Sequence, residues 1–437
     1  MRQLFKSVFN FVLGKRNIGF YFATLNAADS FLALFYSFAV LLGLPIASKG
    51  GEKLRVLAQN DFGDKKIFFY VSARSALYGH LKCLGFEPGS EVIVTGFTCE
   101  VVPNAVVQAG LKPVYIDINP ANYCMDPKLL KEKITNKSRV LIIQHTFGIP
   151  AQIDELLAIA REHNLYVIED CAVSLGTRFK GELTGTFGDA AIFSFELSKT
   201  ITSCRGGMLL INTDNLNGIK KQQDFYEKVP EQPVFYASNI LLQLGLSGLL
   251  YRPVIFNLGK YLISFLFKLK VFKNSTSVQE EHAKMPENYL LRLSGQQAEV
   301  LVRQWKKLDK IIDNSKKLAL VYYEGLRDVR KLSAFPIKPE ARVNLIRYPI
   351  LVDNRQDMLD FFWTKGIELD KWFAAPLSSP IIDHSLFGYT FGQCPVAEKC
   401  ASQICNLPTN LRTTASDARK IVSFLLKGPS IEYESAK

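Results

Sequence analysis

Short apolar runs alternate with longer amphipathic stretches between residues 68 and 212. The runs are EVIVTG, PVYIDI, RVLIIQ, YVIED, AAIFSF and GGMLLIN, and helical spacing separates them, most clearly over residues 101–109 and 153–163. Such alternation predicts a largely parallel sheet covered by helices. Ligands of open α/β sheets bind beyond the carboxyl ends of the strands, so the residues that follow each run are candidates for a site.

A second, smaller α/β unit is predicted toward the C-terminus. A long amphipathic helix is expected over residues 293–313, followed by the strand RYPILV, a helix over 357–366 and a closing helix from Ser416. We therefore divide the chain into an apolar N-terminal segment (1–60), a large domain (61–229), an apolar basic insert (230–285), and a connecting helix with a small C-terminal domain (286–437).

Two uncharged runs interrupt this globular pattern. They are SFLALFYSFAVLLGLPIAS over 30–48 and QPVFYASNILLQLGLSGLLY over 232–251. Each is near the minimum length of a bilayer span. The second continues as RPVIFNLGKYLISFLFKLKVFK, in which basic residues punctuate apolar ones as in a helix lying in a lipid interface. We expect both runs to hold the protein at the cytoplasmic face of a membrane, mainly through residues 233–273; buried helices of an oligomer are the alternative.

Composition narrows the possible partners. Hydrophobic residues make up 48% of the chain and charged residues 22%, which excludes a disordered protein. The net charge of +12 suits anionic ligands or lipid, but the basic residues are dispersed and follow no nucleic-acid-binding motif, so we expect no nucleic-acid partner. The start MRQLFKSVFNFVLGKRN resembles a signal peptide without a cleavage pattern, and we expect no secretion. The eight cysteines form no CxxC pair and predict reduced thiols, with no metal site.

The strongest chemical signal is a carboxylate and an amine at the same predicted sheet edge. Asp170 ends the strand in YVIEDCA, and Lys199 lies in the loop of AAIFSFELSKTITSCRGGMLLIN. This pairing suits pyridoxal phosphate, because a lysine can form a Schiff base with it and a carboxylate can keep its pyridine nitrogen protonated. Taken alone the pair is weak, since a loop lysine is usually solvated and a carboxylate after a strand is often a helix cap.

Longer motifs strengthen the assignment. The segments EVIVTGFTCEVVPNAVVQAGLKPVYIDINPANYCMDPKLL, QHTFGIPAQIDELLAIAREHNLYVIEDCA, GTFGDAAIFSFELSKTITSCRGG and FGQCPVAEKCASQICNLPTNL resemble, in order and spacing, the DegT/DnrJ/EryC1/StrS family of sugar aminotransferases. The resemblance implies a fold-type-I enzyme that depends on pyridoxal phosphate. It also implies a homodimer that aminates a keto-sugar on a nucleotide, with glutamate or a related amino donor.

The resemblance assigns roles to particular residues. Lys199 falls on the Schiff-base lysine, Asp170 on the partner of the pyridine nitrogen, and Ser194 on a phosphate-binding serine. Ala73 and Arg74 in VSARSAL fall on the phosphate-holding Gly-Thr, where amides that open a helix could bind a dianion; a surface arginine is the alternative for Arg74.

One further histidine is expected close to the cofactor. His145 in QHTFG falls on a family histidine near the cofactor, and a purely structural histidine is the alternative.

Several positions depart from the family pattern. The aromatic residue that usually stacks on the cofactor ring falls on Cys99, the glutamine near the ring hydroxyl on Val173, and the asparagine lent by the neighbouring subunit on Leu290. Asn288 is a candidate to replace that asparagine.

Core packing is the expected role of two neighbouring aromatic residues. Trp372 and Phe373 match only loosely the region where the family's small domain closes on the sugar.

Three hypotheses follow. The leading one is an aminotransferase in which Lys199 holds the cofactor and later moves a proton between substrate and cofactor. The second is a pyridoxal-phosphate-dependent sugar dehydratase, which Lys199 disfavours because such relatives carry a histidine there. The third is a membrane-bound scaffold of the same fold without catalysis. In the first case the acceptor sugar is carried on a nucleotide or on a lipid.

Overall fold

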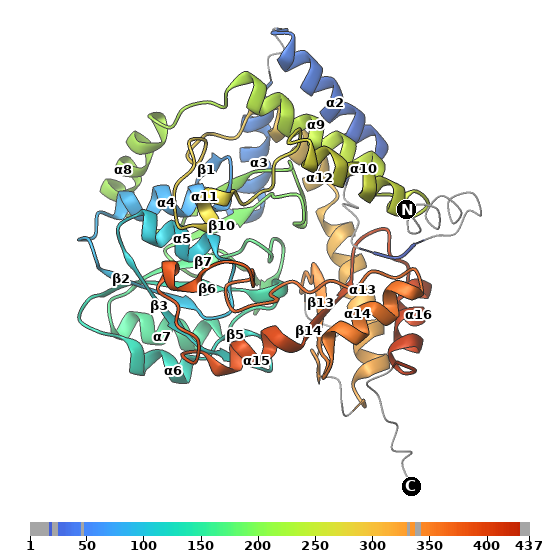
Figure 1. Cartoon of the computed structure of the whole chain (residues 1–437). Helices are drawn as coiled ribbons and strands as arrows, with labels where there is room; N and C mark the ends of the chain where they lie inside the picture. The colour runs from blue at the N-terminus through green and yellow to red at the C-terminus, as the bar shows by residue number, and fades with distance from the viewer. Residues whose placement is uncertain (1–16, 20–24, 45–47, 330–332, 337–341, 429–437) are drawn as a thin grey trace.

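The computed structural model describes residues 17–19, 25–44, 48–329, 333–336 and 342–428 (Figure 1). The stretch that resembles a signal peptide falls almost wholly within residues 1–16 and so lies outside the described residues.

A seven-stranded sheet forms the centre of the large domain, in the order β1-β11-β10-β7-β6-β2-β3. Only β11 runs antiparallel to its neighbours, and the other pairings are parallel. All six predicted runs are strands, and β1 was not predicted. The strands are β1 Lys66–Tyr70, β2 Glu91–Thr95, β3 Lys112–Ile116, β6 Ser138–Gln144, β7 Tyr166–Asp170, β10 Ala190–Ser194 and β11 Gly207–Ile211.

Helices cover both faces of this sheet, and the strand residues divide between the two faces by alternation. Val92 and Val94 belong to one apolar cluster, whereas Ile93 between them belongs to another. The first face packs under α4 and α5 and the second under α6 and α7. The covering helices are α3 Gly50–Phe62, α4 Ala73–Leu84, α5 Val101–Gln108, α6 Pro127–Lys133, α7 Ile153–Glu162 and α8 Leu216–Glu227.

The C-terminal part is a smaller α/β unit built on a three-stranded antiparallel sheet, as predicted. The single helix expected over 293–313 is wrong: the chain forms α12 and α13, which are separated at Lys306 and Lys307. The apolar spacing continues on both sides of this break and therefore does not reveal it. The elements are α12 Gly295–Trp305, α13 Leu308–Leu326, β12 Ser333–Ala334, β13 Arg347–Leu351, α14 Arg355–Thr364, α15 Pro395–Gln403, β14 Ile404–Pro408 and α16 Ala415–Leu425.

The two uncharged runs form helices that pack against each other. Helix α2 (Ala27–Leu41) lies beside α9 (Val234–Leu250), and α10 (Phe256–Lys268) follows α9 (Figure 1). Ser37 Oγ donates a hydrogen bond to the carbonyl of Ser238, with an O···O distance of 2.8 Å. A Cβ at Gly245 would come within 2.6 Å of the Leu34 side chain, so the glycine permits this close approach.

A buried carboxylate anchors α2 to the body of the protein. Asp29 is fully buried, and its oxygens lie 2.7 Å from Arg303 Nε and 2.9 Å from Lys307 Nζ. Asp29 also closes a capping box with Asn26 at the start of α2. Helix α2 is therefore part of the folded core along one face.

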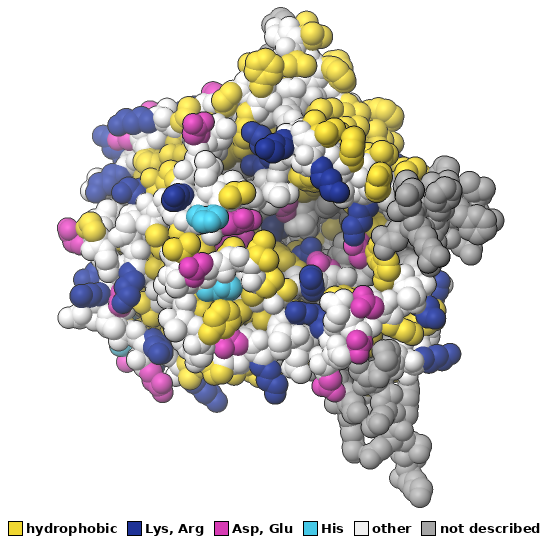
Figure 2. Space-filling model, in the orientation of Figure 1, with side chains coloured by type: hydrophobic (Ala, Val, Ile, Leu, Met, Phe, Trp, Pro, Cys, Tyr) yellow, Lys and Arg dark blue, Asp and Glu magenta, His cyan; other side chains and the backbone are white. Residues whose placement is uncertain are grey.

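The opposite faces of these helices are exposed and apolar (Figure 2). Phe31, Phe35 and Phe38 are 60%, 56% and 59% exposed. Among the described residues, no helix is both long enough and apolar enough to cross a membrane. We call this surface the apolar ridge, and its members are Phe31, Phe35, Phe38, Leu41, Leu42, Val234, Phe235, Tyr261, Leu262, Phe265 and Leu269.

Candidate active site

One pocket lies where β7 and β10 end and α4 begins. All the site residues expected from the sequence except His145 line it. The pocket thus joins strand ends that are far apart in sequence, as the sheet topology requires. The predicted residues in its wall are Ala73, Arg74, Cys99, Asp170, Ser194 and Lys199.

Asp170 is the last residue of β7, and its side chain is almost wholly buried. Burial raises the pKa of Asp170, because desolvation disfavours the charged carboxylate. The Ala172 amide, which donates to Oδ1 at 3.0 Å, and the nearby Lys199 both act in the opposite direction. A cation placed in the pocket beside Asp170 would therefore favour the ionised carboxylate, against the effect of burial.

Lys199 lies in the turn that follows β10. Its amide donates to the carbonyl of Glu196 at 3.0 Å, which fixes the backbone of the turn. Burial lowers the pKa of the Lys199 amine, and Arg347 lowers it further. A lowered pKa increases the fraction of neutral amine, which is the form that reacts with a carbonyl.

Trp372 is a pocket residue that our sequence prediction missed. Its ring centroid lies 4.4 Å from Lys199 Nζ and 4.2 Å from the Arg347 guanidinium, and the ring lines the pocket. Trp372 packs against the core as expected but lines the pocket as well, which was not expected. Phe373 is buried as expected and stacks on Trp372 at 4.7 Å. Trp372 matches the family motif only weakly, so the sequence did not predict it as a site residue. Only the folded small domain brings Trp372 to Lys199.

The start of α4 provides donors for an anion. Ser72 caps this helix, and Ala73 and Arg74 are its first two residues, so their amides have no acceptor within the helix. Such amides, together with the helix dipole, favour a phosphate group. Gly207 passes so close that a Cβ there would lie 2.3 Å from the Ala73 nitrogen, which explains a glycine at this point. Ser194 adds a hydroxyl to the same pocket.

The Arg74 side chain is mostly buried and is paired, so the alternative of a surface arginine is wrong. Its NH1 lies 2.5 Å from Oε1 of Glu280, and the two side chains are only 11% and 4% exposed. Glu280 comes from the short helix α11 (Val278–Glu281) and lines the same pocket. Arg74 therefore connects the start of α4 to a segment that covers the pocket.

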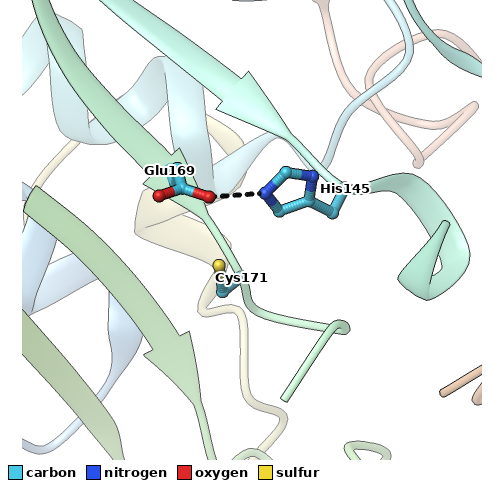
Figure 3. Close-up of side chains that lie close together, drawn as sticks. All are labelled: His145, Glu169 and Cys171. Carbon is cyan, nitrogen blue, oxygen red and sulfur yellow. Dashed lines mark hydrogen bonds and ion pairs between the residues drawn. The ribbon is translucent and has the colours of Figure 1, made fainter. Parts of the chain in front are cut away.

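His145 does not line the pocket and lies in a buried polar network (Figure 3). One ring nitrogen, Nε2, is 3.0 Å from Oε2 of Glu169, and the other, Nδ1, accepts from the Ala151 amide at 3.2 Å. With both nitrogens engaged, the structural role has direct support.

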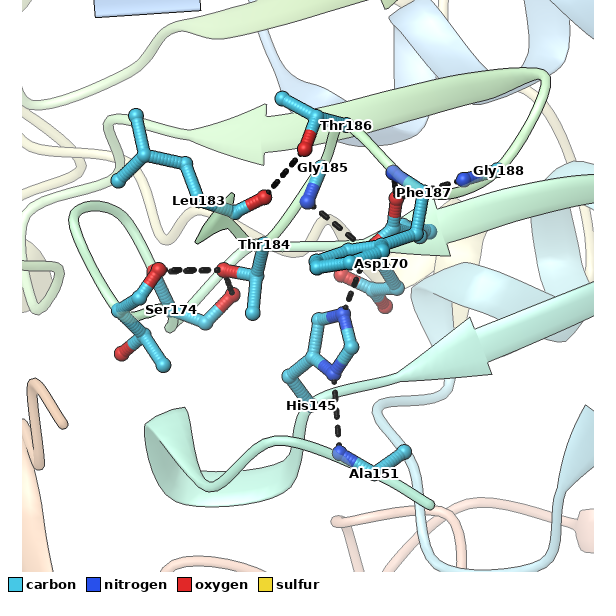
Figure 4. A network of polar contacts seen from close by, with 12 residues as sticks. His145, Ala151, Asp170, Ser174, Leu183, Thr184, Gly185, Thr186, Phe187 and Gly188 are labelled. Carbon is cyan, nitrogen blue, oxygen red and sulfur yellow. Dashed lines mark hydrogen bonds and ion pairs between the residues drawn. The ribbon is translucent and has the colours of Figure 1, made fainter. Parts of the chain in front are cut away.

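Glu169 is the centre of this network. Its carboxylate accepts hydrogen bonds from the amides of Gly185, Phe187 and Gly188 at 2.7 to 2.8 Å, and Figure 4 shows this turn above His145. The ligand atoms of His145, Glu169 and Cys171 are close enough to surround an ion. However, the carboxylate oxygens are already shared among amide and imidazole donors, and burial raises the pKa of the Cys171 thiol. The cluster is therefore explained as support for the sheet edge.

The positions that depart from the family pattern separate in the structure. Cys99 lines the pocket, and burial raises the pKa of its thiol. Val173 and Leu290 are absent from the pocket wall, whereas Asn288 and Tyr289 of the same chain are part of it. The position expected to serve a neighbouring subunit thus lies in a loop that borders the pocket of its own chain.

The residues present fit pyridoxal phosphate. An amine of lowered pKa, a buried carboxylate and the free amides of a helix start all border one cavity. These three features match the aldehyde, the pyridine nitrogen and the phosphate of the cofactor in chemical type.

We predict that Glu169→Gln destabilises the protein by about 1–3 kcal/mol, because a neutral amide oxygen cannot serve all the donors that meet the carboxylate. Unfolding in urea, followed by circular dichroism, measures the loss. Glu155→Gln changes an exposed carboxylate on α7 and should stay within about 0.5 kcal/mol of the original. Equal stability of both variants would contradict the assigned role of Glu169.

Known proteins resemble this chain over most of its length or over part of it. It is 27% identical over 382 residues to an uncharacterised protein of Methanocaldococcus jannaschii, covering 86% of this chain and 89% of that one. It is 35% identical over 175 residues to the GDP-perosamine synthase of Escherichia coli O157:H7, covering 39% of this chain and 48% of the synthase. In fold, it matches a putative sugar aminotransferase from Streptococcus pneumoniae, solved in its PMP form, with a TM-score of 0.71, 19% identity and coverage of 93% and 96%.

The profile of the DegT/DnrJ/EryC1/StrS aminotransferase family matches residues 61–232 and 265–426. Solved structures of fold-type-I aminotransferases match this chain in fold, which confirms the architecture expected from the sequence. The chain belongs to the DegT/DnrJ/EryC1/StrS family and is a pyridoxal-phosphate-dependent aminotransferase.

Proposed function

We propose that this protein is a homodimer that transfers an amino group from glutamate, or a related donor, to a keto-sugar joined to a carrier. The observation that carries the proposal is the meeting of Lys199, Asp170 and the start of α4 in one pocket. The relatives named for sugar amination, such as GDP-perosamine synthase, support a sugar as the acceptor. Lys199 and the family membership favour transamination over sugar dehydration or a scaffold without activity.

The residues divide the work by their chemistry. Bound pyridoxal phosphate would supply the electron sink that lets an amino group pass from donor to acceptor. Lys199 Nζ would hold the cofactor and, once released, would carry a proton to and from the substrate carbon. That role needs the neutral amine, which the lowered pKa of Lys199 favours.

Asp170 and the helix start would hold the two ends of the cofactor. The carboxylate of Asp170 would face a protonated ring nitrogen, and this contact would favour its ionised form against the effect of burial. Ala73, Arg74 and Ser194 would hold the phosphate. Trp372 would limit access of water to Lys199, beside which its ring lies.

We expect purified protein supplied with pyridoxal phosphate to show a visible absorbance band that Lys199→Ala loses. Asp170→Asn should keep the band but lower turnover with glutamate by about 100-fold or more, because it removes the charge opposite the ring nitrogen. Lys220→Ala, on the exposed face of α8, is the control and should behave as the original. Failure of the original protein to take up the cofactor in excess would overturn the central proposal.

The role of Arg74 can be separated from that of its ion pair with Glu280. If Arg74 holds the phosphate, Arg74→Ala should raise the cofactor dissociation constant about tenfold or more. Glu280→Gln should lower that constant or leave it unchanged, since it removes an anion beside the phosphate and keeps the arginine. Equilibrium dialysis measures both. An equal rise in the two variants would show instead that the ion pair acts only by holding α11 in place.

We also propose that the apolar ridge contacts the cytoplasmic face of a membrane. The ridge is an exposed apolar surface of aromatic and aliphatic side chains, and such surfaces commonly mark an interaction site. Lys268, Lys270 and Lys273 are exposed at its edge and suit anionic head groups. Because the ridge helices are packed onto the protein, this contact would be shallow, with side chains entering one leaflet.

Substitution of the ridge tests the membrane proposal. The triple variant Phe31→Ser/Phe35→Ser/Phe38→Ser should bind vesicles of anionic and zwitterionic lipid at least about tenfold more weakly in sedimentation, because it removes apolar area from the contact. The control is Ile381→Ser/Leu386→Ser/Phe391→Ser, which removes exposed apolar residues elsewhere.

Light scattering on the same variants identifies the rival role. A dimer that becomes a monomer only in the ridge variant, with no vesicle binding by the original protein, would assign the ridge to a subunit interface.

A further inference from the structure

A second cleft opens beside the active-site pocket and is built largely by the insert. The two cavities share Arg205, Tyr236 and Asn288 in their walls, so they adjoin. Helix α9 supplies Phe235, Asn239, Ile240 and Gln243 to the rest of the wall and lies entirely in residues 233–264, which the family profile does not match. The cations of the wall, Arg205, Lys270 and Lys273, lie in the matched segments. The unmatched residues thus complete the cleft together with matched segments of the family core.

Three positively charged residues line this cleft. Arg205, Lys270 and Lys273 all belong to its wall, and the described lining residues include no Asp or Glu. A cleft lined by cations alone favours a polyanion. Arginine can bind two phosphate oxygens at once, and lysines add mobile point charges.

The arginine is held in place by neighbouring groups. Arg205 NH1 donates to Tyr236 Oη at 3.1 Å, and NH2 donates to the carbonyl of Asn274 at 2.5 Å. The guanidinium also lies 5.7 Å from the Tyr236 ring centroid. This arrangement places a fixed cation at the junction of the two cavities.

The rest of the wall is mainly apolar. Pro233, Phe235, Ile240 and Val271 contribute to it, and Phe235 is 78% exposed and belongs also to the apolar ridge. The cleft thus adjoins the Lys199 pocket, contains three cations and meets an exposed apolar surface at Phe235. Cations beside an apolar surface complement a lipid diphosphate in chemical type.

We propose that this cleft binds the diphosphate of the acceptor and that the carrier beyond the diphosphate is a lipid chain. The inference rests on the proposed function, since it places the keto-sugar in the Lys199 pocket. The diphosphate lies at Arg205, Lys270 and Lys273, and the first part of the chain lies along Phe235, Ile240 and Val271. Membrane contact through the apolar ridge delivers such an acceptor to the cleft.

Binding of short probes to the full-length holoenzyme tests this site without turnover. The probes are farnesyl diphosphate, farnesol, inorganic diphosphate, UDP and GDP, measured by isothermal titration calorimetry. We expect farnesyl diphosphate to bind at least about tenfold more tightly than each of the others. Tighter binding of UDP or GDP would overturn the lipid assignment, and equal binding of farnesol would assign the affinity to apolar adsorption alone.

Substitutions locate the binding in the cleft. Lys270→Gln/Lys273→Gln should weaken the binding of farnesyl diphosphate and of inorganic diphosphate by about tenfold each, because both probes lose charge contacts. Phe235→Ser should weaken only farnesyl diphosphate. Lys220→Gln/Lys221→Gln, which removes two exposed charges from α8, is the matched control and should leave all constants unchanged. No effect of the cleft substitutions would overturn the proposal.

The cofactor band reports separately on the proposed function. In the cleft variants we expect an unchanged band and an unchanged response of that band to glutamate, since these residues bind the carrier. If the band never forms in the original protein, the proposed function fails, whereas an intact band without farnesyl diphosphate binding rejects only the cleft.

Discussion

Two adjacent carboxylates at the end of β7 organise the site. Because successive side chains of a strand point to opposite faces, Glu169 and Asp170 must point in different directions. The Glu169 carboxylate accepts hydrogen bonds from three backbone amides and contacts His145 Nε2, and these bonds fix the turn beside the strand end. Asp170 is thereby left to face the pocket, where the Ala172 amide and Lys199 counter the effect of burial on its pKa. The end of β7 therefore supplies both Glu169, which supports the neighbouring turn, and Asp170, which faces the pocket.

Much of this arrangement could be predicted from the sequence. Apolar runs of strand length gave six strands of the central sheet, and their parallel order brings Asp170 and Lys199 to one edge without knowledge of side-chain positions. Strand β1 was missed because KIFFY borders the region where alternation was first clear. The break between α12 and α13 was missed because apolar spacing is preserved across it.

The pattern of apolar and polar positions could not predict contacts between segments that lie far apart in the sequence. The ion pair of Arg74 with Glu280 joins residues 206 positions apart, and Trp372 reaches Lys199 from the small domain. The role expected for His145 depended on which way its ring points, and the ring is held by Ala151 and Glu169. For the apolar runs, composition indicated exposed or buried helices but could not divide each helix into the face that packs and the face that remains exposed.

Helices α2 and α9 show how the packed face and the exposed face of an apolar helix are determined. A helix that is apolar all round must be covered on every face or must meet an apolar surrounding. Small residues at the α2–α9 contact let the two backbones approach, and Asp29 pairs with Arg303 and Lys307 to hold α2 on the core. Once these faces are buried, the large side chains of the same helices can only point outward. The surface that results meets a cationic cleft at Phe235, and that cleft shares lining residues with the active-site pocket, so this packing brings apolar, charged and reactive groups near one another.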